Sequence, residues 1–87
     1  MKIKNGFVVR SIAGESVVVA LGEASKTFNG IIKLNETGRF LWDKLSDGCE
    51  LNELVEAILS EYEIDRETAE ADVVRFTETL KGANILE

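Results

Sequence analysis

The spacing of hydrophobic positions changes once along the 87-residue chain, close to residue 34. Before that point the apolar residues form short segments rich in β-branched side chains, at residues 7–12, 16–20 and 28–34. Such segments predict three β-strands. After it, apolar residues recur every three or four positions, which predicts three amphipathic helices. We therefore expect one α+β domain spanning residues 1–87, with three antiparallel strands followed by three α-helices.

The three predicted strands leave one edge of the sheet open. Ala13-Gly14-Glu15 separates the first two strands, and its glycine suits the positive φ of a hairpin turn. In the third strand, even positions such as Ile32 and Leu34 share one face, which we assign to the core, and Ile31 lies on the other face. No later strand can pair with this one. Its outer edge can therefore accept an extended peptide.

Capping signals delimit the predicted helices. Asn35 is a favoured N-cap for the first helix, which Asp47-Gly48 ends, and Asp65 caps the third. Glu50 is a weaker cap for the second helix. The turn Glu63-Ile64 joins the last two helices. This arrangement predicts a winged helix-turn-helix-like fold, in which Gly82 or Asn84 ends the third helix and the last residues return to the core.

The residues that most enzymes use are scarce in this chain. Histidine is absent, Cys49 is the single cysteine, and the glycines do not follow the spacing of a phosphate-binding loop. A histidine-based triad is therefore excluded, and a zinc site is close to excluded. The thiolate of Cys49 is disfavoured beside Asp47 and Glu50. We expect no enzymatic activity, no metal and no cofactor.

Charge is distributed unevenly along the sequence. Residues 1–34 hold five basic and two acidic side chains, a net charge of +3, whereas residues 35–87 hold five basic and fourteen acidic ones, a net charge of -9. Solvated helix faces that favour glutamate are one explanation. The third helix and its cap carry five acidic and three basic residues, so we expect no nucleic-acid binding. The longest apolar run, residues 17–21, is too short to cross a membrane, and we expect a cytoplasmic protein.

Several segments carry a resemblance to a known family. The order of the elements and three stretches of sequence resemble the PqqD family over nearly the whole chain. Two positions depart from the family pattern, namely Glu50 in place of threonine or serine and Asn84 in place of glycine; both are capping positions. The matching stretches are Ile32-Lys33-Leu34-Asn35-Glu36-Thr37-Gly38, Leu51-Asn52-Glu53-Leu54-Val55 and Asn84-Ile85-Leu86-Glu87.

The resemblance implies a non-catalytic peptide chaperone or recognition element for ribosomally made, post-translationally modified peptides. Such a module binds the leader of a precursor peptide as an added strand on the third strand, beside the third helix. It presents the precursor to a modifying enzyme such as a radical SAM protein. The positions that this implies here are Phe28, Gly30, Ile31, Ile32 and Lys33 on the strand and Ala71, Val74, Arg75, Glu78 and Lys81 on the helix.

Other interpretations stay open from the residues alone. Phe28 and Ile32 are as well explained by core packing as by ligand contact, whereas Ile31 and Val74 lie off the main apolar stripes and favour recognition. A docking subunit that binds a biosynthetic enzyme without holding a peptide is a second functional class, and a winged-helix DNA-binding protein is a third. The sequence does not identify the precursor or the modified product.

Overall fold

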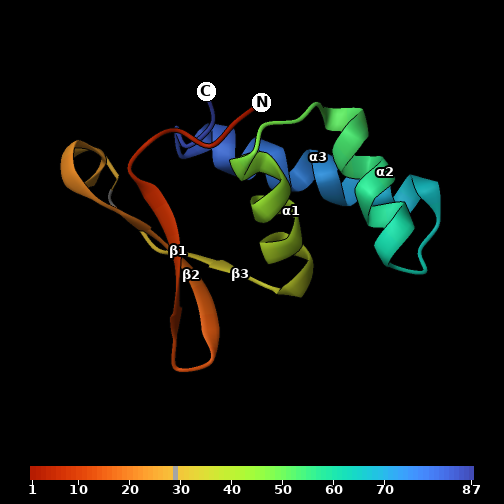
Figure 1. Ribbon diagram of the computed structural model, residues 1–87, viewed down its shortest axis with the longest axis horizontal. Coiled ribbons are helices and arrows are strands. Elements are labelled where there is room, and N and C mark those ends of the chain that lie inside the picture. Colours follow the sequence, from red (N-terminus) through yellow and green to blue (C-terminus); the bar gives the residue numbers. More distant parts are fainter. Residues whose placement is uncertain (29) are drawn as a thin grey trace.

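A computed structural model describes residues 1–28 and 30–87 and places the sheet on one side of the molecule and the helices on the other (Figure 1). The observed order of strands and helices matches the α+β order expected from the sequence. The elements are β1 (Phe7–Ile12), β2 (Glu15–Ala20), the 3-10 helix η1 (Gly22–Lys26), β3 (Ile32–Leu34), α1 (Glu36–Ser46), α2 (Leu51–Glu61) and α3 (Arg66–Gly82).

The sheet is antiparallel, with the strand order β1-β2-β3. Ala13 and Gly14 form the turn of the hairpin with φ values of 53° and 81°, so that Ile12 pairs with Glu15. Two consecutive positive φ angles are the geometry of a two-residue hairpin turn that matches the twist of its strands. This turn fixes the register of β1 against β2, and β2 in turn pairs with β3.

The third strand is shorter than the sequence predicts. We expected a strand over residues 28–34, but among the described residues of this range only Ile32–Leu34 pairs with β2. The segment before it forms η1, and the N–H of Phe28 donates to the carbonyl of Ala24 at 3.1 Å. Phe28 and Gly30 therefore precede the strand, and Asn29 lies outside the described residues.

The core lies between the sheet and the three helices. Leu34 and Val18 contribute from the sheet, and the helices contribute side chains that are 0 to 5% exposed. Apolar residues spaced three and four positions apart supply the core from α1, α2 and α3, and its buried members are Leu41, Trp42, Leu45, Leu54, Val55, Ile58, Ala69, Val73 and Leu80. Phe28 packs edge-to-face against Phe7 with ring centroids 5.4 Å apart.

The junction of β3 and α1 is held by the predicted cap. The side chain of Asn35 accepts a hydrogen bond from the N–H of Gly38 at 2.8 Å. A Cβ at Gly38 would lie 3.2 Å from Asn35 Oδ1 and 3.5 Å from the ring of Phe76. A side chain at Gly38 would therefore crowd the capping oxygen of Asn35, whereas the ring of Phe76 would be at an ordinary contact distance.

Removing this cap should destabilise the domain measurably. Asn35→Ala leaves an N–H of the first turn of α1 without its acceptor, which costs about 1 kcal/mol. For a domain of this size we expect the midpoint of thermal unfolding to fall by about 4–8 °C. Circular dichroism checks this, with Asn52→Ala on the exposed face of α2 as the control. A melting temperature equal to that of the parent would contradict the capping role.

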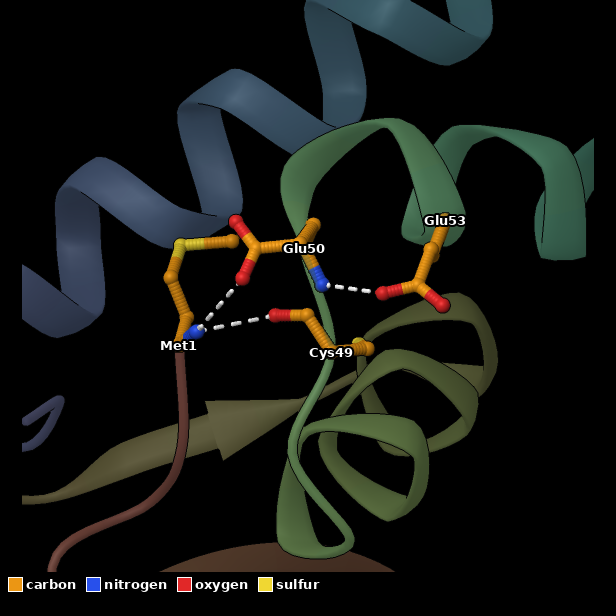
Figure 2. Close-up of polar contacts among 4 residues, drawn as sticks. All are labelled: Met1, Cys49, Glu50 and Glu53. Carbon is orange, nitrogen blue, oxygen red and sulfur yellow. Dashed lines mark hydrogen bonds and ion pairs between the residues drawn. The ribbon is translucent and has the colours of Figure 1, made fainter.

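The start of the chain is tied to the start of α2 (Figure 2). The terminal amine of Met1 donates to the carbonyl of Cys49 at 3.0 Å and lies 4.0 Å from the carboxylate of Glu50. The backbone N–H of Glu50 donates to Oε1 of Glu53 at 2.7 Å. The weak cap expected at Glu50 is thus supplemented by the Glu53 side chain and by an ion pair.

Both ends of the chain lie together (Figure 1). Ile3 forms a bridge with Leu86, and Ile85 is fully buried, so the last residues return to the core as predicted. Asn84 has the left-handed φ of 60° that we expected at Gly82 or Asn84, and α3 extends through Gly82. Among the described helices, none is long and apolar enough to cross a membrane.

Candidate peptide-binding groove

One edge of β3 is open, as the sequence predicts. In an antiparallel ladder, directly opposed residues alternate between hydrogen-bonded and non-hydrogen-bonded pairs. The pair Ile12–Glu15 that closes the two-residue turn is hydrogen-bonded. Counting along β2, the backbone of Val17 therefore faces β1, and the pair Val17–Lys33 is a non-hydrogen-bonded one. It follows that the backbone N–H and C=O of Lys33 point to the open edge, whereas those of Ile32 and Leu34 point to β2.

A groove runs along this open edge. Its volume is about 1110 Å³, and it is bounded by β3, the first turns of α1, the middle of α3 and the β1–β2 turn. Ile32, Leu34, Leu41 and Phe76 supply its apolar lining. The remaining lining residues are Gly14, Glu15, Ser16, Lys33, Asn35, Glu36, Thr37, Gly38, Arg39, Asp72, Arg75 and Thr79.

A smaller depression of about 380 Å³ continues the groove toward the end of α3. Ile32 lines both hollows, so the two meet at the start of β3. The smaller hollow is lined by Thr27, Phe28, Gly30, Ile31, Ile32, Gly82, Ala83 and Asn84. Together the two hollows follow one side of β3 and one face of α3, and we call them the β3–α3 groove.

The structure brings together all the strand positions that were expected to form the site. Phe28, Gly30, Ile31 and Ile32 line the smaller hollow, and Ile32 and Lys33 line the larger one. Ile31 is 75% exposed. Phe28 and Ile32 are half-buried and also pack against the core, so both explanations considered for them apply.

On the helix, the structure brings only one of the expected positions into the groove. Of the five positions, only Arg75 lines the groove, and Ala71, Val74, Glu78 and Lys81 line neither hollow. Successive residues of a helix are separated by about 100° around its axis. Asp72, Phe76 and Thr79 lie on one side of the buried stripe and face β3, whereas Val74 and Lys81 lie on the other side.

Several groove residues were not identified from the sequence as part of the site. Phe76, Asp72 and Thr79 line the groove from α3, and none of them was singled out from the sequence as a site residue. Their spacing, with Phe76 four residues after Asp72 and Thr79 three residues after Phe76, is that of a single helix face. Gly38 and Arg39 enter the lining from α1, directly after the Asn35 cap.

Charges around the groove form pairs of opposite sign. Lys33 Nζ lies 3.2 Å from a carboxylate oxygen of Glu15, and Arg75 lies 3.4 Å from Asp72. Arg39 lies 3.2 Å from Asp43. The groove is therefore close to neutral although the chain has a net charge of -6. An apolar floor with paired charges at the rim suits an uncharged extended backbone better than a strongly charged ligand.

The described residues hold no group of three or more histidine, cysteine, aspartate or glutamate side chains that could bind a metal ion. Burial raises the pKa of the Cys49 thiol, and the negative charge of Glu53 raises it further. Cys49 is therefore a poor nucleophile at neutral pH, in agreement with the expectation that its thiolate is disfavoured.

Comparison with known proteins identifies the fold. The family model described as "Coenzyme PQQ synthesis protein D (PqqD)" matches residues 15–86. The chain belongs to the PqqD family. Its matched region includes the whole of β3, α1, α2 and α3, and hence every described residue of the β3–α3 groove except Gly14.

Two solved structures are similar to this PqqD-family chain. A structure of TbiB1 in complex with the TbiA(beta) leader peptide is 32% identical in sequence, with a TM-score of 0.78, and the match covers 100% of this chain and 95% of that one. A lasso peptide synthetase B1 complexed with the leader peptide shares the fold at 23% identity, with a TM-score of 0.73 and coverage of 97% and 93%. The comparison with curated proteins gave no match.

Proposed function

We propose that this protein is a non-catalytic recognition element that binds the leader segment of a ribosomally made precursor peptide. The observation that carries the proposal is the open edge of β3 beside a groove with an apolar floor. Membership of the PqqD family supports it, as does the likeness to TbiB1, whose structure contains a leader peptide. Because such precursors are made by ribosomes, the proposal places the protein in the cytoplasm.

In the proposed mode, the leader adds to the sheet as a strand next to β3. The N–H and C=O of Lys33 supply backbone hydrogen bonds, which depend little on the peptide's sequence. Side chains of the leader that point toward α3 enter the groove, where they contact Ile32 and Phe76. Backbone pairing thus supplies general affinity, and the apolar groove selects among peptides.

The proposed partner is the enzyme that modifies the precursor, such as a radical SAM protein. The leader would be held at the β3–α3 groove while the rest of the precursor extends away from it. Helices α1 and α2 carry exposed acidic side chains outside the groove, among them Asp43 and Glu53. A second function, as a docking subunit that holds no peptide, would leave this groove without a role.

A genome-derived peptide library tests the proposal directly. Overlapping 20-residue peptides that cover the short open reading frames of the source genome are displayed and selected against the tagged protein. We expect enrichment of peptides from one or a few reading frames that lie beside genes for modifying enzymes. Selection in parallel against a variant with the groove blocked identifies the binding site. Enrichment that is equal for both proteins, or none at all, would contradict the proposal.

We also predict that the protein does not form a specific complex with DNA. The three basic residues of α3 lie in ion pairs with carboxylates, namely Arg66 with Glu56 at 2.9 Å, Arg75 with Asp72 at 3.4 Å and Lys81 with Glu78 at 3.9 Å. With its basic side chains paired and a net negative charge from five acidic and three basic residues in α3 and its cap, the helix has no excess positive charge to attract phosphates. A gel-shift assay at low salt is the most permissive measurement. A discrete complex that survives competitor DNA would contradict this prediction.

A further inference from the structure

Two exposed side chains lie at the open edge, one of them charged and the other apolar. Lys33 alternates with the core-facing Ile32 and Leu34, so its side chain lies on the face away from the helices. Ile31, directly before β3, is 75% exposed. Covering this side chain with an apolar side chain of an added strand would be favourable, because it removes apolar surface from water. An added strand would place its own side chains beside both residues.

The ammonium of Lys33 can form an ion pair with a second carboxylate. It lies 3.2 Å from Glu15, which belongs to β2 and is therefore on the side away from the open edge. The Lys33 side chain remains 69% exposed, and an ammonium has three N–H donors. Directly opposed residues on adjacent strands have Cβ atoms about 5 Å apart. A carboxylate on the added strand would thus be close to Lys33 and one strand farther from Glu15.

The neighbours of that peptide residue have a different environment. In a strand, successive side chains point to opposite faces. The residues before and after the one opposite Lys33 therefore point to the helix side of the sheet, into the larger hollow. There they meet Ile32, Leu34 and Phe76, which favour apolar side chains. This alternation holds whether the peptide runs parallel or antiparallel to β3.

We propose that the β3 edge selects peptides with a short sequence pattern. The pattern has an acidic side chain opposite Lys33 and apolar side chains immediately before and after it. A further apolar side chain lies two positions from the acidic one, opposite Ile31. The inference rests on the proposed function, since it specifies the peptide that the same groove takes. It names Lys33 as the residue that selects charge. Basic side chains at the same peptide position are rejected because they face the ammonium at the distance of a cross-strand pair.

A displayed library of random ten-residue peptides tests this register. It is selected against the parent protein, against Lys33→Glu and against Arg10→Glu. Arg10 lies on the same face in β1, so its replacement makes the same change in charge away from the open edge. We expect Asp or Glu to be favoured over Lys about fivefold at one peptide position with the parent and with Arg10→Glu. With Lys33→Glu, Lys or Arg should be favoured at that position.

A double variant controls for a loss of folding in Lys33→Glu. Lys33→Glu places two carboxylates together, whereas Glu15→Lys combined with Lys33→Glu keeps the ion pair in reverse. We expect the double variant to select the same basic position. An unchanged charge preference in both variants, with binding still blocked by a bulky residue in the groove, would overturn this inference and leave the proposed function intact. Selected peptides that ignore both the groove and the β3 edge would overturn both.

Discussion

Proline at Lys33 is expected to weaken peptide binding about thirtyfold while the domain remains folded, and proline at Ile32 is expected to unfold much of it. The N–H of Lys33 points to the open edge, so Lys33→Pro removes a donor that only the added strand uses and places a ring in its path. The N–H of Ile32 points to Val18, which is 1% exposed. Losing that bond within the sheet costs about 3 kcal/mol, which is a large part of the stability of a small domain.

Two measurements test the two proline variants. Circular dichroism reports folding, and calorimetry reports the affinity for a peptide obtained from the genome-derived library. Lys33→Ala is the control, because it removes the charge but keeps the backbone donor, and we expect it to lower affinity by no more than about fivefold. If Lys33→Pro is folded and binds the peptide like the parent, the added strand does not pair with β3.

Filling the groove from α3 should have the other large effect. Thr79 is exposed and lines the larger hollow, so Thr79→Trp adds an indole where the peptide would lie without disturbing the core. We expect the affinity to fall about a hundredfold, which corresponds to about 2.7 kcal/mol. The helix should keep its stability, because the hydroxyl of Thr79 bonds only to the carbonyl of Arg75, within the same helix.

The adjacent residue provides a matched control. Glu78 is also exposed but lines neither hollow, so Glu78→Trp adds the same bulk on a face turned about 100° away. We expect its affinity to stay within about threefold of the parent. The pair separates the helix face seen in the structure from the face expected from the sequence, which included Glu78. Stronger loss in Glu78→Trp than in Thr79→Trp would place the peptide on the other side of α3.

The local elements could be predicted because short-range physics determines them. The change from β-branched runs to residues spaced by three and four indicated strands followed by helices, and Asn35 marked the start of α1. The open edge followed from the absence of a strand after β3. The length of β3 could not be predicted, because the backbone N–H of Phe28 forms a hydrogen bond with Ala24 of η1 and Phe28 does not join the sheet.

Only the tertiary structure decided which side of α3 meets the strand. The buried stripe of α3 has two flanks, with Asp72 and Thr79 on one and Val74 and Lys81 on the other. The 3.6-residue period of the helix identifies the buried stripe but does not show which flank faces β3. The sequence analysis favoured the second flank because it contains Val74, an apolar residue outside the buried stripe, which is exposed in the structure. The path of the chain from β3 through α1 and α2 places the first flank against β3. The sequence by itself therefore determined the fold class, the caps and the strand that carries the open edge. The packing of α3 determined which residues line the groove, because a groove is formed by two elements that are distant in sequence.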